Sequence, residues 1–200
     1  MQDDAPETIR TLAEGCVRFV KQALGIELDG TPETLPILDH YLERAREDDA
    51  VSRDEVLGLV ATSAGAYLGE VVRRAQPHAR WHVGDPDDPS TWRIELEHVF
   101  LAFNPVGMAR EAITMEEEEG WNAHLEVLAQ DREALAQSLE RVGAVEDEDY
   151  WRLAIRWEGI DQAIAVLESA AQARGEGARR WPPEIYRAAL DEREPTSAPS

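Results

Sequence analysis

The residues of this sequence best suited to hold a metal ion are its histidines, but their spacing does not favour a metal site. No pair of histidines follows the spacing of a helical zinc motif with its glutamate base. His78 and His82 are four residues apart, but Pro77 and a strand pattern interrupt any continuous helical face. His82, Glu95 and His98 would converge if their strands pair, and such a set could bind a divalent metal. The alternative, which we favour, is that they are exposed sheet residues beside turns, so we predict no metal and no cofactor.

The candidates for nucleophilic catalysis and for phosphate binding are equally weak. Ser63 precedes Ala64 and Gly65, but it lies within a predicted helix and not in the strand-to-helix turn of a serine hydrolase. Gly58, Gly65 and Gly69 do not follow a strand, so they do not form a phosphate-binding loop. Carboxylates are too abundant here to mark an acid–base pair. The sequence leaves open whether the protein is an enzyme, and we lean toward a non-enzyme.

The strongest chemical feature is an excess of acidic side chains. Forty-one aspartates and glutamates stand against 20 basic residues, which gives a formal net charge of -21 at pH 7. A negative field repels nucleic-acid phosphates and anionic membrane surfaces. We therefore expect no direct nucleic-acid binding and no membrane association, and no apolar run reaches membrane-spanning length. A basic partner protein fits this charge, although the acids could also serve only to keep the protein in solution.

Two acidic stretches lie next to tryptophans and are the candidate binding sites for such a partner. One is an Asp-rich loop between Trp81 and Trp92, and the other is a run of four glutamates before another tryptophan. Adjacent acids concentrate negative potential, and an aromatic ring adds an apolar contact or a cation–π contact with arginine. Solvated loop ends are the competing interpretation, and Trp81 and Trp92 could also pair across a hairpin. The residues we predict to bind the partner are Asp85, Asp87, Asp88, Glu116, Glu117, Glu118, Glu119 and Trp121.

The cysteine and lysine contents point to a cellular setting. Cys16 is the only cysteine, lies on the apolar stripe of a predicted helix and is interpreted as a core residue. The acidic N-terminus lacks the apolar centre of an export signal. All of the 20 basic residues except Lys21 are arginines, a bias typical of GC-rich bacterial genomes. We expect a cytoplasmic bacterial protein.

Hydrophobic periodicity predicts three helices in the N-terminal third. The first spans residues 6–24, with Asp3 or Asp4 as its cap and Gly25 at its end. The second runs from residue 31 or 34 to residue 46. Ser52 and Glu55 form a capping box that opens the third helix, residues 52–75. Its glycines at 58, 65 and 69 share one face, which predicts close contact with another element or, less favoured, a bound ligand.

The middle of the chain changes to a strand pattern. Residues 80–83 form a short strand candidate, and residues 84–90 are rich in loop-forming types. Trp92, Ile94 and Leu96 alternate with charged residues, as in a half-buried strand, and residues 99–103 are apolar. The alternation changes parity near Glu97, which predicts a tight turn or a β-bulge. We expect a small antiparallel sheet of two or three strands.

The C-terminal half is predicted to be helical again. Asn104 caps a helix over residues 105–115, and two longer helices cover residues 121–142 and 146–175. Acids at 146–149 would complement the N-terminus of the last of these. A short helix at 184–190 precedes a polar tail, residues 192–200, which we expect to be disordered. The sequence thus predicts one α+β domain over residues 1–191, predominantly helical, with a small antiparallel sheet in the middle.

These features favour a non-catalytic protein-interaction domain of the adaptor, inhibitor or immunity type that binds a basic surface. The alternative is an enzyme or a small-ligand-binding domain with its site between the glycine-rich helix 52–75 and the sheet. The sequence does not indicate an oligomeric state.

Overall fold

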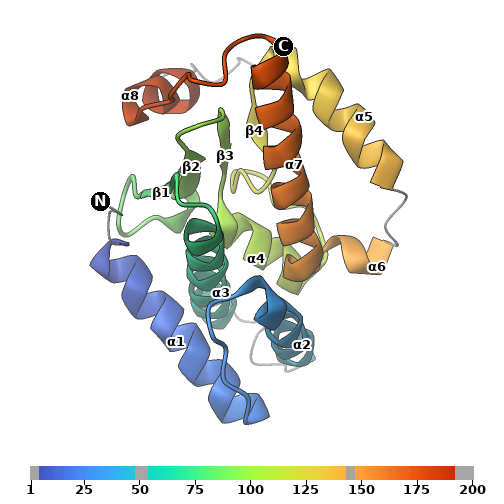
Figure 1. The fold of residues 1–200 in the computed structure, drawn as a ribbon. Helices are drawn as coiled ribbons and strands as arrows, with labels where there is room; N and C mark the ends of the chain where they lie inside the picture. Colours follow the sequence, from blue (N-terminus) through green and yellow to red (C-terminus); the bar gives the residue numbers. More distant parts are fainter. Residues whose placement is uncertain (1–4, 48–53, 143–146, 192–200) are drawn as a thin grey trace, which may run out of the picture.

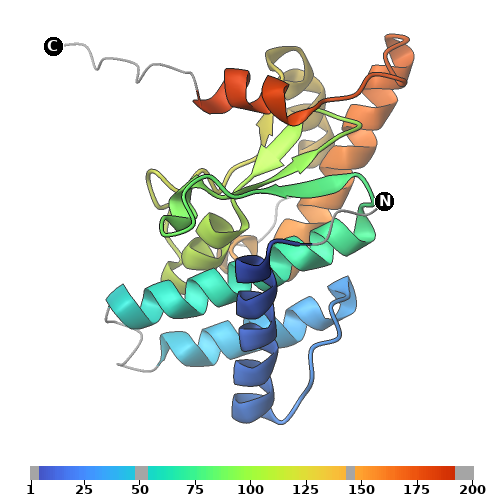
Figure 2. The ribbon, with the colours of Figure 1, turned by 90° about the vertical axis from the view of Figure 1, so that its left-hand side faces the viewer.

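The computed structural model describes residues 5–47, 54–142 and 147–191. It confirms an α+β fold, mostly helical, with one small antiparallel sheet (Figure 1). The strands follow one another in the order β1 (Ala79–His82), β2 (Arg93–Leu96), β3 (Leu101–Phe103) and β4 (Glu126–Val127). Figure 2 shows the sheet lying between the C-terminal segment on one side and the N-terminal helices on the other.

The first two helices lie close to their predicted positions. Helix α1 spans Glu7–Leu24 and ends at Gly25, whose φ of 71° is the left-handed conformation that glycine adopts without strain. Its capping position is Pro6, which provides no side-chain cap, and the predicted caps Asp3 and Asp4 lie outside the described residues. After a 3-10 turn, Pro32–Thr34, helix α2 spans Leu35–Arg46. Cys16 is buried as predicted, and burial raises the pKa of its thiol to about 12.

Helix α3, Asp54–Ala75, is the central element of the core. It packs between α1 and α4 (Pro105–Thr114), and α1 crosses it steeply (Figure 2). The sequence expectation that no apolar run reaches membrane-spanning length is wrong for this helix, which is long and apolar enough to span a membrane; 67% of its most apolar window is, however, buried inside the protein. Packing of a core helix therefore accounts for its apolar sequence. The predicted cap at Ser52 lies outside the described residues.

The sheet has two covered faces, which corrects the prediction of a half-buried strand. Trp81 pairs with Ile94, and both face the helical core, whereas Arg80 pairs with Glu95 on the opposite, outer face. Glu95 was expected at the surface but is 0% exposed. The C-terminal strap, residues 181–191, covers it: α8 (Pro183–Tyr186) and a π-helical turn (Arg187–Asp191) lie on this outer face (Figure 1).

Strand β4 lies inside the segment that was predicted as a helix from 121 to 142. Val127 pairs with Leu101, and helix α5 covers only Arg132–Val142. Gly120 with φ 85° and Asn122 with φ 48° break any helical path before the strand. Edge pairing with β3 therefore overrides the apolar spacing that suggested a helix. The bend after Leu96 is the predicted tight turn, since β2 and β3 pair antiparallel across it.

The predicted last long helix is divided into two. Helix α6 spans Asp147–Tyr150, and α7 runs from Leu153 to Ala173 beside the sheet (Figure 1). One hydrophobic cluster connects the helices and the core face of the sheet, from Ile9 in α1 to Leu167 in α7. The tail predicted to be disordered, residues 192–200, lies outside the described residues.

Candidate functional site

A pocket of about 570 Å³ lies on the outer face of the sheet, beyond the end of the C-terminal strap. All four strands contribute to its lining: His82 from β1, Arg93 from β2, Ala102 and Phe103 from β3, and Glu126 from β4. Ala102 is 1% exposed and also belongs to the apolar cluster that Phe100 forms with Trp181 and Tyr186 of the strap. The walls are the Asp-rich loop (residues 84–92), the turn at residues 120–122, and Leu190 with Asp191 of the strap.

Asn104 holds two walls of this pocket together. The side chain is 1% exposed, and its oxygen accepts the N–H groups of Val106 and Gly107 at 2.8 and 3.2 Å, as predicted for a helix cap. Its amide nitrogen donates to the carbonyl oxygens of Pro89 and Ser90 at 2.9 and 3.1 Å. Its backbone N–H donates to the carbonyl of Asn122 at 3.0 Å. One buried side chain therefore fixes the Asp-rich loop and the 120–122 turn against the start of α4.

Two of the three predicted aspartates shape their own loop. Asp85 Oδ1 accepts the backbone N–H of Asp87 at 2.9 Å, and Asp88 Oδ1 accepts the N–H and hydroxyl of Ser90 at 3.1 and 2.6 Å. Such bonds from an aspartate to the backbone two residues on stabilise turns. Asp85 lines the pocket, and all three aspartates are exposed to solvent. The Trp92 indole donates to the Asp85 carbonyl at 2.8 Å, so this ring supports the loop from inside.

Of the four glutamates in the predicted run, one forms an ion pair and the other three are exposed. Glu118 binds Arg110 of α4, with its Oε2 2.7 Å from Nε, and the Arg110 guanidinium lies over the Trp121 ring at 4.5 Å. Trp121 is thus stacked with an arginine of its own chain, an interaction that helical or strand spacing does not predict because the chain turns between the two residues, at Met115 and Gly120, both with positive φ. Glu116, Glu117 and Glu119 are exposed, and no basic residue of the described chain pairs with them.

Charged groups of the pocket floor and wall form a network around the buried Glu95. Arg93 donates to Glu95 at 2.9 Å and to both oxygens of Asp191 at 2.6 and 3.3 Å. Arg80 binds the other Glu95 oxygen at 2.9 and 3.0 Å. Burial, together with the charge of Arg93, lowers the pKa of His82 and so favours its neutral form. The network connects the strap to the sheet.

The convergence of His82, Glu95 and His98 occurs only in part. His82 Nδ1 lies 3.9 Å from Glu95 Oε1, but His98 turns away and pairs with Glu168 of α7 at 2.9 Å. Among the residues that the structure describes, no three histidine, cysteine or carboxylate groups are placed to hold a metal.

The alternative site between the glycine-rich helix and the sheet is filled by protein. A Cβ at Gly65 would lie 2.7 Å from the backbone nitrogen of Val106, and one at Gly69 would lie 3.0 Å from Cε2 of Trp81 and closer to other ring atoms. Both glycines therefore allow close packing of α3 against α4 and β1, as the glycine face predicted. Gly58 has no neighbour within 4 Å and does not share this role.

Comparison with known proteins gives a partial match without an activity. Residues 1–96 are similar to the family of unknown function DUF6278, which covers just under half of the chain. No curated protein and no solved structure matches. The matched segment contains α1, α2, α3, β1 and β2 and stops before Asn104.

Proposed function

We propose that the protein is a non-catalytic interaction domain that binds a basic protein surface through an acidic rim. The rim consists of Asp85, Asp87, Asp88, Glu116, Glu117 and Glu119. The observation that carries the proposal is that the Asp-rich loop and the 120–122 turn, which directly follows the glutamate run in sequence, are walls of one pocket and are both bonded to Asn104. A partner could therefore contact both segments at once, which separate surface loops would not allow.

The charge distribution supports this assignment. Many arginines of the described chain are engaged by its own carboxylates, for example Arg93, Arg110 and Arg156, each at 2.6–2.9 Å. The excess acids therefore remain as surface charge, and Glu116, Glu117 and Glu119 contribute to it. Complementary charge raises the association rate of a partner more than it raises final affinity. An adaptor, an inhibitor or an immunity-type protein is the class that fits.

Trp121 has an indirect role in this proposal. Its ring and Glu118 hold Arg110 between them, which fixes the turn beside the rim. The backbone of Trp121 also packs on α4, since a Cβ at Gly107 would lie 2.7 Å from its carbonyl oxygen. Both residues therefore position the rim, and they should stay unchanged in a test of its charge.

The test begins with capture of a partner from the native cell extract and its identification by mass spectrometry. Association and dissociation rates are then measured for the wild type and for the triple variant Glu116→Gln, Glu117→Gln, Glu119→Gln. We expect association to slow by about tenfold at low salt, with a weaker salt dependence and little change in dissociation.

The matched control removes three exposed acids outside the rim: Glu7→Gln, Glu33→Gln and Glu158→Gln. The control changes the net charge by the same amount as the rim variant. A difference in association rate between the two variants therefore reports the position of the removed charges and not their number. Equal association rates for the rim variant and the control would contradict the proposal, because only the overall charge would then matter.

A second candidate is a small polar ligand on the pocket floor. The volume of about 570 Å³ falls in the range of small-molecule sites, and His82, Arg93, Glu126 and Asp191 converge there. A ligand found by screening should keep its affinity in the rim triple variant and lose it in Glu126→Gln. If the ligand instead loses affinity in the rim triple variant, the rim and not the floor binds it, which would favour the protein-binding function.

A further inference from the structure

A second hollow, of about 340 Å³, lies between α1, the link that follows it and α3. Three arginines line it: Arg10 from α1, and Arg73 and Arg74 from the last turn of α3. Three acids, Glu14, Asp29 and Glu70, line it too, so the hollow has as many basic as acidic side chains in a chain where acids outnumber bases 41 to 20. All of the lining residues lie within the segment that resembles the family of unknown function.

Arg10 and Arg74 differ from the other arginines discussed so far in their lack of an ion pair. Arg80, Arg93 and Arg156 each have a carboxylate oxygen within 2.6–2.9 Å. In the described part of the chain, no carboxylate forms an ion pair with Arg10 or Arg74. Arg74 feels the charge of Glu70 from a distance, but neither guanidinium donates to a carboxylate of the described chain, so both can donate to an incoming acceptor.

The Arg74 side chain is held in a defined place. A Cβ at Gly30 would lie 3.0 Å from Cζ of Arg74 and closer still to Nη1, so the guanidinium lies directly against the Gly30 backbone. Gly30 has a φ of 80°, and its N–H donates to the Tyr67 hydroxyl at 2.9 Å. A basic residue in the last turn of α3 also suits the helix dipole. The dipole does not explain why the guanidinium is packed on Gly30 beside a hollow.

Two of the three carboxylates that line the hollow accept hydrogen bonds from other side chains of the protein. Arg73 donates to both oxygens of Glu70 at 2.8 and 2.9 Å, and the Trp81 indole donates to Glu70 at 3.0 Å. Burial raises the pKa of Glu70, but these hydrogen bonds and the charges of Arg73 and Arg74 outweigh it, and the pKa is lowered. Asp29 accepts hydrogen bonds from Thr31 at 2.7 and 2.9 Å. Glu14, exposed on α1, is the one acid lining the hollow that forms no ion pair or hydrogen bond with a side chain of the described part of the chain.

We propose that this hollow binds the oxyanion group of a small molecule, a phosphate or a carboxylate, through Arg74 and Arg10. A guanidinium presents parallel N–H donors that match two oxygens of such a group. The site is independent of the acidic rim, because it lies on the helical side of the sheet and shares no residue with the rim pocket.

The test measures binding of sodium phosphate and of sodium succinate by calorimetry and by thermal unfolding, against sodium chloride at equal ionic strength. We expect at least one of the two anions to bind and to raise the melting temperature above the chloride value. Binding of phosphate alone identifies a phosphate ligand, and binding of succinate alone identifies a carboxylate ligand. Arg74→Gln should weaken binding by about tenfold, the value of one charge-assisted contact.

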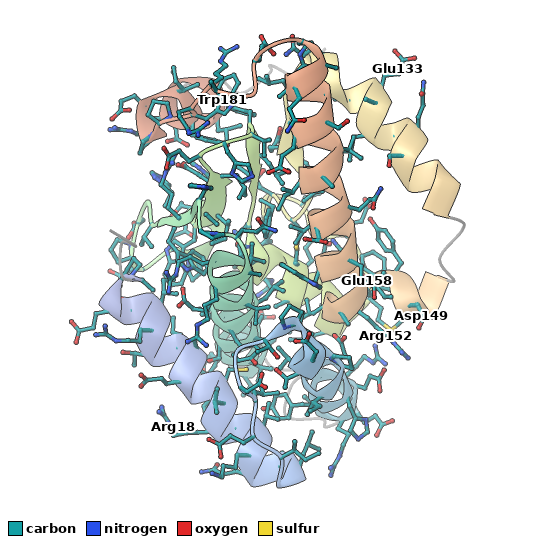
Figure 3. All side chains as sticks on the ribbon, viewed as in Figure 1. Arg18, Glu133, Asp149, Arg152, Glu158 and Trp181 are labelled. Atoms are coloured by element: carbon teal, nitrogen blue, oxygen red, sulfur yellow. The ribbon has the colours of Figure 1, made fainter. Side chains whose placement is uncertain are left out.

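Arg18→Gln is the matched control, because Arg18 lies on α1 outside the hollow and its side chain points away from the other helices (Figure 3). This variant should bind like the wild type. Circular dichroism confirms that both variants are folded, and Arg10→Gln provides a second measurement if Arg74→Gln is not. Absence of any effect beyond chloride, or equal binding by wild type and Arg74→Gln, overturns the proposal.

Discussion

Gly65 has a packing role that no larger residue can take over. Its Cα faces the first turn of α4, where a Cβ would lie 2.7 Å from the Val106 nitrogen and 2.8 Å from the Pro105 carbonyl oxygen. These neighbours are backbone atoms, which cannot rotate away as a side chain can. Asn104 fixes the same turn, so movement of α4 would also disturb the pocket.

We predict that Gly65→Ala destabilises the protein by about 1–3 kcal/mol through overpacking, despite the better helix propensity of alanine. Gly58→Ala on the same helix is the control. It has no neighbour within 4 Å and should stabilise by about 0.5–1 kcal/mol. Unfolding in guanidinium chloride, monitored by circular dichroism, gives both values. A Gly65→Ala variant as stable as Gly58→Ala would show that α4 can move away at little cost.

Residue patterns predicted the glycine face and the Asn104 cap, but not the surroundings of Glu95. The cap depends on local chemistry, and the sequence contains it entirely. Glu95 alternates with apolar residues and therefore resembles a solvent-facing strand position. It is buried because the strap, far along the chain, covers the outer face and because Arg80 and Arg93 neutralise it. Periodicity along one strand carries no information about a distant covering segment.

At the scale of elements, helix α7 begins on a carboxylate from another helix. Asp39 of α2 accepts the backbone N–H groups of Leu153 and Ala154 at 2.7 and 3.0 Å. The sequence predicts acids at 146–149 beside the N-terminus of this helix, but α7 starts only at Leu153. Asp39 thus both caps α7 and fixes α2 against it.

The Asp39 cap should make stability depend on pH in the acidic range. Burial is the largest influence and raises the pKa of Asp39 from 3.8 to about 6, against the two hydrogen bonds that lower it. The folded state therefore holds the Asp39 proton more tightly than the unfolded state. The contribution of this group to the unfolding free energy is greatest below pH 4 and decreases by about 1–3 kcal/mol as pH rises from 4 to 6.

The measurement compares wild type with Asp39→Asn, which keeps an acceptor oxygen but does not titrate. The difference in unfolding free energy, wild type minus variant, should decrease between pH 4 and pH 6 and stay level above pH 7. Taking the difference removes the contribution of the other carboxylates. A difference that rises over the same interval would mean that the hydrogen bonds outweigh burial and that the pKa of Asp39 is lowered.

The ends of helices were predictable where a capping residue marks them in the sequence. They were unpredictable where hydrogen bonding to a neighbouring strand decides the structure. Gly25 and Asn104 mark the ends of their helices in the sequence itself. The segment before α5 has apolar residues at helical spacing, yet it forms β4 because Val127 pairs with Leu101. The acidic rim was predicted as two separate candidates. Asn104 bonds both the Asp-rich loop and the 120–122 turn after the glutamate run, and no spacing rule predicts that a helix cap also binds two loops.

At the scale of the whole molecule, basic and acidic residues differ in how often they are paired. The basic residues largely bind acids of the same chain, and several of these pairs are shielded, as in the network around Glu95. The formal net charge of -21 therefore corresponds to surface carboxylates that repel one another in the folded state. Unfolding moves these charges apart and relieves the repulsion.

We predict that moderate salt stabilises the protein for this reason. Salt at 0.1 M screens charges over about 10 Å, so it weakens repulsion among surface acids much more than attraction in buried pairs. A gain of about 1 kcal/mol would raise the melting temperature by about 2–4 °C for a chain of this size. Thermal unfolding in increasing NaCl measures the gain, and KCl at equal concentrations excludes specific binding of sodium. The rim triple variant, with three fewer charges, should start from a higher melting temperature and gain less from salt. A melting temperature that stays level or falls with salt would mean that local pairing of the acids, and not their mutual repulsion, dominates the electrostatics of the fold.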